Sequence, residues 1–97
     1  MKTFKDLEFK THPMAEGLNG VISRIMFDNG WGASVVSHTF SYGGKDGKYE
    51  LAVLDSSGEL HYDNPVAGGD VQGYLDEEEV TYLLAAIQEY ERFNQEV

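Results

Sequence analysis

The sequence predicts an α+β fold: an antiparallel β-meander of four to five strands with one C-terminal amphipathic helix packed on one face. Three observations lead to this prediction. Short segments of alternating apolar residues are separated by glycine-rich turns. An Asn-Gly pair joins two of these segments. A capping residue near the C-terminus precedes apolar residues at helical spacing. With 97 residues and 41% hydrophobic content, we expect a single α+β domain over residues 1–97.

The predicted strands follow the apolar segments in order. The first is a short edge strand that ends before Pro13, because the residue before a proline avoids helical backbone angles. Apolar residues on both faces of the second predict a strand that is covered on both sides. In the last, we expect Leu60 and Tyr62 to point inward. The five predicted strands are residues 3–10, 21–28, 33–40, 49–55 and 59–63.

Two turns punctuate the meander. Asn29-Gly30 predicts a type I′ turn, in which both central residues adopt positive φ. Residues 55–58 form the second tight turn. Trp31 follows the first turn and has two alternative places, either exposed at the hairpin tip as an interface anchor or folded onto the helix.

The helix is predicted from its cap and its apolar stripe. Asp76 is a good N-cap, and Glu79 three residues later completes a capping box. We expect the helix to lie across one face of the sheet and to run to about Phe93. The stripe consists of Val80, Leu83, Leu84, Ile87 and Tyr90.

The charge is distributed unevenly along the chain. Residues 1–48 hold six Lys/Arg and five Asp/Glu, a net of +1, whereas residues 49–97 hold one and twelve, a net of −11. Such a field repels nucleic acid and anionic membranes and attracts basic protein surfaces. We therefore expect a protein partner with a basic surface, bound by an acidic face that includes Glu50, Asp55, Glu59, Asp63, Asp70, Glu77 and Glu78. The acidic residues of the first helical turn are also explained by capping alone.

A glycine-rich loop at residues 41–48 is the alternative contact site. Its glycines let the backbone approach a ligand closely, and Tyr42, Lys45 and Lys48 supply a ring and two cations. The spacing is not that of a P-loop, and the loop precedes a predicted strand instead of a helix. As a plain connection between strands, it needs no ligand.

No residue pattern predicts catalysis or a cofactor. The chain has no cysteine, and His12, His38 and His61 are scattered without metal-binding spacing. Ser34 and His38 share a strand face but lie too far apart for a hydrogen bond. We therefore expect no enzyme and no metal site. No apolar run reaches membrane-spanning length and the first residues lack a signal peptide, so we expect a cytoplasmic protein.

Several segments together resemble a known family. They are residues 27–36, 41–44, 49–55, 73–75 and 77–80. With these segments the chain resembles a family of small uncharacterised proteins of tailed bacteriophages, over roughly residues 4–87. The resemblance implies a phage or prophage origin and expression in a bacterial cytoplasm. No activity is known for that family, so no site residue carries over. This chain departs from the family at residues 67–69 and after Tyr90, which concerns a loop and an end.

Three functions from different classes remain. The favoured one is non-enzymatic binding to a basic surface of a host or defence protein, with carboxylates that imitate the phosphates of nucleic acid. The second is binding of a nucleotide or another small ligand by the 41–48 loop. The third is a homodimer formed through an unpaired strand edge.

Overall fold

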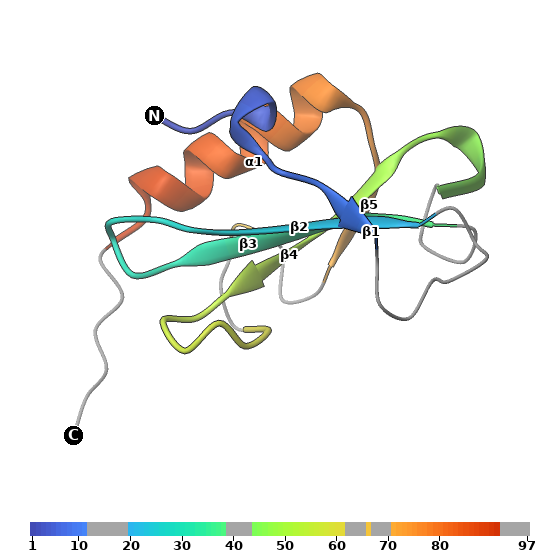
Figure 1. Cartoon of the computed structure of the whole chain (residues 1–97). Coiled ribbons are helices and arrows are strands. Elements are labelled where there is room, and N and C mark those ends of the chain that lie inside the picture. The colour runs from blue at the N-terminus through green and yellow to red at the C-terminus, as the bar shows by residue number, and fades with distance from the viewer. Residues whose placement is uncertain (12–19, 39–43, 62–65, 67–70, 92–97) are drawn as a thin grey trace.

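A computed structural model describes residues 1–11, 20–38, 44–61, 66 and 71–91 of the chain. It contains a five-stranded antiparallel sheet, in which the strands lie side by side in the order of the sequence, and one helix (Figure 1). The predicted α+β meander with one C-terminal helix is therefore confirmed. Its elements are η1 (Phe4–Asp6), β1 (Lys10–Thr11), β2 (Val21–Met26), β3 (Gly32–Ser37), η2 (Gly44–Asp46), β4 (Tyr49–Leu54), β5 (Gln72–Leu75) and α1 (Glu77–Glu89).

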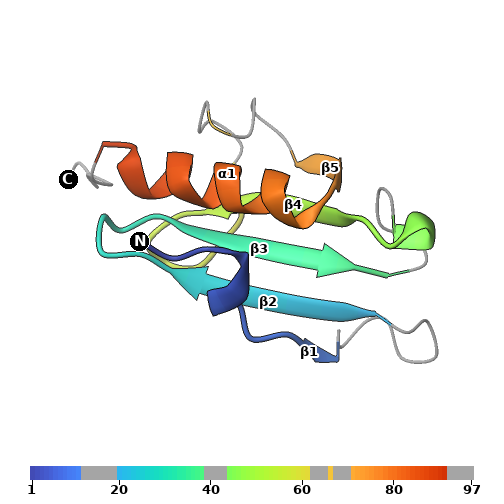
Figure 2. The same cartoon turned by 90° about the horizontal axis from the view of Figure 1, so that it is seen from above.

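The core lies between α1 and one face of the sheet. Seen from above, the helix runs along the sheet over β3 and β4 (Figure 2). Alternate residues of a strand point to opposite faces, so every second residue of β3 and β4 meets the helix. The predicted stripe supplies the other half of this core. Its fully buried members are Ala33, Val35, Leu51 and Val53 from the sheet and Val80, Leu84 and Ile87 from the helix.

The hairpin between β2 and β3 forms where it was predicted, but its turn is of another type. Phe27 N donates to Trp31 O at 2.8 Å, and Gly30 N donates to Phe27 O at 3.1 Å. Gly30 has φ 88°, whereas Asn29 keeps a negative φ. A type I′ turn needs positive φ at both residues, so that prediction is wrong. The loop has one residue more than a two-residue hairpin, and only the glycine adopts the left-handed conformation.

Trp31 belongs to the core. Its side chain is 6% exposed, which settles the alternative between an exposed anchor and a folded ring in favour of the latter. The indole Nε1 donates to Glu91 O at 2.8 Å, just beyond the end of the helix. The ring also meets Tyr90 edge-on, with centroids 5.8 Å apart. Trp31 therefore joins the β2–β3 hairpin to the C-terminal end of α1.

The helix begins as predicted and ends earlier. Asp76 and Glu79 form the expected capping box. The helical backbone stops at Glu89, because Tyr90 has the extended angles φ −68° and ψ 159°. The predicted end near Phe93 is therefore wrong, and Phe93 itself lies outside the described residues. The apolar residues keep helical spacing in the sequence beyond Glu89. The helix nevertheless ends there, because Tyr90 leaves the helical path and packs on Trp31.

The chain after β4 differs from the prediction. The turn at residues 55–58 forms, with Gly58 at φ 83°. No strand at residues 59–63 is present in the part of this segment that is described, which ends at His61. Leu60 makes an isolated bridge to Leu54 and is 42% exposed, so it does not point inward as predicted. Tyr62 lies outside the described residues.

The fifth strand is β5, which the sequence did not indicate. It pairs with β4 with a register shift between Tyr49 and Leu51. Tyr74 within β5 has φ 56°, a left-handed conformation that costs a non-glycine residue about 1–2 kcal/mol. Because the strand is irregular at this point, its side chains do not follow the strict alternation by which a strand is recognised in a sequence.

The N-terminal segment is only partly a strand. Residues 4–6 form the short helix η1, and pairing is limited to the two residues of β1, so a strand over residues 3–10 is wrong. The predicted edge position is correct. Phe4 and Phe9 pack around Tyr49 with ring centroids 5.1–5.7 Å apart. These aromatic contacts explain why the segment leaves the sheet: it bends over the sheet toward α1.

The predicted cover on both faces of β2 is also wrong. Ile25 packs against the core on the helix side. On the opposite face Met26 is 46% exposed and Arg24 is exposed. The 55–61 segment lies on that opposite side of the sheet (Figure 1), where Arg24 Nη1 lies 3.5 Å from Gly58 O.

Candidate functional site

Part of the predicted acidic face lies on the side of the sheet opposite α1. Leu51 faces the helix and is fully buried, so its neighbour Glu50 points to the other face. Asp55 and Glu59 belong to the turn after β4, which Figure 1 shows on that same side. Asp55 is held within its turn, since its Oδ1 accepts from Ser57 N at 2.9 Å, Ser57 Oγ at 2.7 Å and Glu59 N at 3.1 Å.

The other described members of the predicted face lie on the helix side. Glu77 and Glu78 occupy the first turn of α1 and are exposed. The structure therefore places the predicted acidic residues in two groups. Glu77 and Glu78 lie on the helix side of the sheet, and the acidic residues in and after β4 lie on the opposite side. Asp63 and Asp70 lie outside the described residues.

The N-cap and the first turn of α1 together carry four consecutive exposed carboxylates, from Asp76 to Glu79. Two of them are engaged by the backbone: Glu79 N donates to Asp76 Oδ1 at 2.8 Å, and Asp76 N donates to Glu79 Oε1 at 3.1 Å. Glu77 lies close enough to Tyr49 for its charge to act there. Burial raises the pKa of the Tyr49 phenol, and the negative charge of Glu77 raises this pKa further.

Glu78 differs from its neighbours. Its side chain makes no hydrogen bond or ion pair with any residue in the described part of the chain. Its carboxylate borders a groove of about 410 Å³ between β5 and α1. We call this groove, lined by Gln72, Leu75, Asp76, Glu78, Glu79, Tyr82 and Leu83, the acidic groove.

The acidic groove combines three kinds of surface. Leu75 and Leu83 add apolar surface to its lining, and Asp76, Glu78 and Glu79 add carboxylates. Tyr82 is 73% exposed. It lies off the apolar stripe of α1, so its helical position could have indicated exposure, but sequence reasoning did not single it out. Tyr74 is also exposed, at 62%, on neighbouring β5.

The alternative loop at residues 41–48 is described only from Gly44 onward. Residues 44–46 form η2, and Gly47 follows with φ 72°. Lys48 is half-buried and its carbonyl accepts from Ser37 Oγ at 2.9 Å. Tyr42 and the side chain of Lys45 lie outside the described residues, so a ligand site there stays a prediction.

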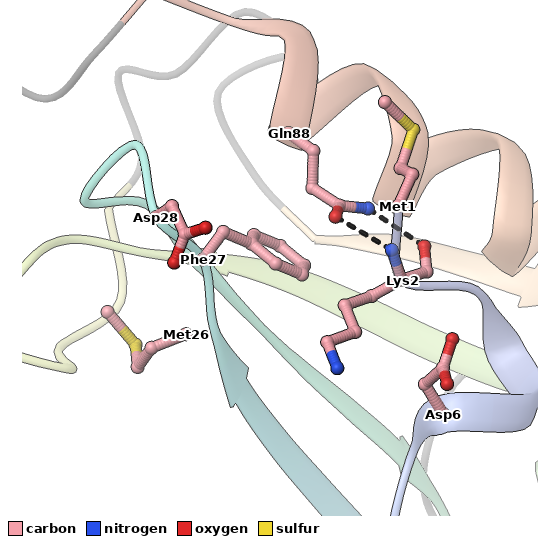
Figure 3. A pocket seen from close by; sticks show the side chains of 7 residues that line it. All are labelled: Met1, Lys2, Asp6, Met26, Phe27, Asp28 and Gln88. Atoms are coloured by element: carbon pink, nitrogen blue, oxygen red, sulfur yellow. Dashed lines mark hydrogen bonds between the residues drawn. The ribbon is translucent and has the colours of Figure 1, made fainter.

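A second pocket, of about 270 Å³, lies where the N-terminal segment meets α1 (Figure 3). Its lining is mostly polar. Lys2 N donates to Gln88 Oε1 at 2.9 Å, and Gln88 Nε2 donates to Lys2 O at 2.8 Å. These hydrogen bonds attach the N-terminal segment to the C-terminal half of α1. The pocket is lined by Met1, Lys2, Asp6, Met26, Phe27, Asp28 and Gln88.

The described histidines are not grouped for metal binding. His61 meets the Trp31 ring edge-on at 4.8 Å, whereas His38 directly follows β3. His12 lies outside the described residues. Within residues 1–11, 20–38, 44–61, 66 and 71–91, no three His, Cys, Asp or Glu side chains are placed to hold a metal ion.

Comparison of the chain with known protein families, with curated proteins and with solved structures finds no match. Among the described residues, no helix has both the length and the apolar character needed to cross a membrane.

Proposed function

We propose that this protein acts without catalysis, by binding a basic surface of another protein through the acidic groove. The observation that carries the proposal is Glu78, an exposed carboxylate whose side chain has no partner in the described part of the chain, in a groove that Leu75 and Leu83 also line. The half of the chain that contains it has a net charge of −11. Such a field accelerates the approach of a positively charged partner.

The groove matches the chemistry of an arginine or lysine side chain. Leu75 and Leu83 offer contacts for its methylene groups, and Glu78 offers an acceptor for its charged end. Tyr82 lines the same groove and can hold a cation against its ring face, an interaction of about 0.5–1 kcal/mol at exposed sites. Asp76 and Glu79 are already used in the capping box, so the main contribution falls to Glu78 and Tyr82.

The resemblance to small phage proteins supports a bacterial host protein as the partner, in the cytoplasm, with host takeover or inhibition of a defence protein as the outcome. The proposed partner normally holds nucleic acid phosphates on its basic surface, and the carboxylates would occupy that surface instead. Direct binding of nucleic acid or an anionic membrane is not part of the proposal, because both carry the same sign of charge.

The proposal is tested with an arginine-rich peptide by fluorescence anisotropy at low and high salt. Glu78→Gln and Tyr82→Ala are expected to weaken binding by about 0.5–1 kcal/mol each. Glu89→Gln is the matched control, since Glu89 is an exposed carboxylate at the other end of the same helix. If the Glu78 and Glu89 variants lose the same amount of binding affinity for the peptide, the peptide binds outside the acidic groove.

A pull-down from bacterial lysate at two salt concentrations then looks for the partner. Retention of a basic protein at low salt and its release at high salt are expected, since screening weakens exposed charge pairs. If neither the peptide nor any basic protein is retained at low ionic strength, the proposal is wrong.

A further inference from the structure

The Asn29 side chain forms a clamp on the end of α1. Its Nδ2 donates to three carbonyl oxygens, of Ile87 at 2.8 Å, Gln88 at 3.2 Å and Tyr90 at 3.2 Å. Its Oδ1 accepts from Trp31 N at 3.2 Å. The last carbonyls of a helix have no partner within the helix, so the hairpin supplies the donor that they need. Both ends of the carboxamide are thus engaged.

Asn29 is followed by Gly30, which gives this clamp a chemical weakness. Glycine has no Cβ to shield its backbone nitrogen, and that nitrogen can attack Cγ of the preceding asparagine. The nitrogen loses its proton as the new C–N bond forms, and the Cγ–Nδ2 bond breaks to release ammonia. Water then opens the resulting succinimide at either carbonyl, leaving a carboxylate in a normal or an isoaspartyl backbone. The only co-reactant is water.

We propose that Asn29 is a site of spontaneous deamidation that the folded protein suppresses, and that the reaction destroys the clamp irreversibly. The suppression follows from the contacts. Gly30 N, the attacking atom, donates to Phe27 O at 3.1 Å, and Nδ2, the leaving atom, is held by the three carbonyls. Attack requires these bonds to open together. The reaction therefore proceeds from locally or globally unfolded molecules.

The product cannot replace the asparagine. At neutral pH a carboxylate only accepts hydrogen bonds, and here it would face carbonyl oxygens that also only accept. The negative end of the helix dipole lies at the same place. The last turn of α1 has no basic residue, and Glu89 and Glu91 add further negative charge there. Deamidation thus exchanges a donor for a repelled charge and weakens the contact between the hairpin and the helix.

The first test compares two states of the wild-type protein at neutral pH, one in native buffer and one unfolded in urea. Peptide mass spectrometry follows the exchange of NH2 for OH at Asn29, and isoaspartate is identified by its separate elution. We expect the native rate to be at least about tenfold lower, since an opening free energy of about 1.4 kcal/mol already reduces the open population tenfold. Equal rates in the two states would overturn the proposal.

The chain contains a reference for the urea measurement. Asn19-Gly20 is a second Asn-Gly pair, so both asparagines are expected to react at similar rates once the chain is unfolded. A slow reaction of Asn29 in urea beside a fast one of Asn19 would overturn the proposal, because the protection would then not come from the fold.

Two variants separate the lost hydrogen bonds from the added charge. Asn29→Ala removes the donor, whereas Asn29→Asp also introduces the carboxylate. The expected order of urea midpoints at neutral pH is wild type, then Asn29→Ala, then Asn29→Asp. The urea midpoints of the two variants are expected to become more similar at acidic pH, where the new carboxyl group is protonated. An Asn29→Asp variant as stable as the wild type would contradict the proposal, and the native and urea rates decide the matter if this variant does not fold.

Discussion

Lys2 and Gln88 exchange two hydrogen bonds across 86 residues of sequence: Lys2 N donates to Gln88 Oε1, and Gln88 Nε2 donates to Lys2 O. The same amide nitrogen donates to Leu84 O at 3.1 Å, which fixes its orientation on the helix. A further bond, from Phe4 N to Thr81 Oγ1 at 3.0 Å, continues the attachment. The N-terminal segment is thus held along α1 by side chains of the helix.

We expect Gln88→Ala to loosen this segment. Loss of the paired amide bonds should lower the free energy of unfolding by about 1 kcal/mol. Hydrogen exchange at the Lys2 and Phe4 amides should accelerate, whereas the amides of β3 should remain protected. Glu89→Ala is the control, because Glu89 is exposed on the same turn. Unchanged exchange at Lys2 would show that the amide pair does not hold the segment.

Gly32 is a position where added volume should destabilise the sheet. A Cβ there would meet Met26 Sδ and the backbone oxygen of Ile25. The methionine end can move, but the backbone oxygen is fixed by the sheet. Gly32→Ala should therefore lower the stability by about 1–3 kcal/mol, as overpacking does elsewhere.

A double variant, Met26→Ala with Gly32→Ala, tests the cause of that loss. Removing the sulfur should recover only part of the stability, measured by urea unfolding, because the contact with Ile25 O remains. Full recovery would show that the flexible side chain alone accounts for the effect.

Asp76→Ala should remove the cap of α1. Its Oδ1 accepts from Glu79 N at 2.8 Å, and loss of such a cap costs about 0.5–2 kcal/mol. Glu77→Ala, the next residue, removes an equal charge without touching the capping box and should cost less. Circular dichroism and urea unfolding compare the two variants. Equal losses of stability would show that charge at the helix end matters more than the capping hydrogen bonds.

Asp55 should titrate at a lower pH than an ordinary aspartate carboxyl. The Ser57 hydroxyl is the main cause that lowers the pKa of this carboxyl below 3.8, and the amides of Glu59 and Ser57 add to it. A carboxyl whose pKa is lower in the folded state stabilises the fold above its unfolded pKa. This contribution is lost as the pH falls through the folded pKa. We expect Ser57→Ala to raise the pKa in an NMR titration and Ser56→Ala to leave it unchanged, whereas a midpoint of 3.8 or above in the wild type would contradict this.

The sequence contained enough information for the order of most elements, because their signals are local. The capping box at Asp76 and Glu79 and the alternation in β4 depend only on neighbouring residues, and both are present in the structure. The strand β5 was missed because its pairing includes a register shift and Tyr74 adopts a left-handed backbone. Neither feature leaves a periodic pattern in the sequence.

The candidate site was less accessible to sequence reasoning. Proximity of Glu77 and Glu78 follows from their adjacency, but the separation of Glu50 from them depends on which face of the sheet the helix covers. The sequence predicts only a turn at Asn29 and gives no sign of its contact with the helix. The carbonyl oxygens that Asn29 binds belong to residues about 60 positions later in the chain. Such long-range hydrogen bonds have no local signature.

The order of strands in the sheet has a consequence for how the chain reaches its native state. Each strand pairs with its neighbour in sequence. The β2–β3 hairpin can form from its short turn with little loop-closure entropy, whereas residues 55–71 separate β4 from β5 and make that pairing more costly. Attachment of Lys2 to Gln88 spans nearly the whole polypeptide and needs the helix to be docked first. Folding should therefore nucleate in the β2–β3 hairpin and end with attachment of the N-terminal segment. Substitutions in β3 should then slow refolding, while Gln88→Ala should mainly accelerate unfolding.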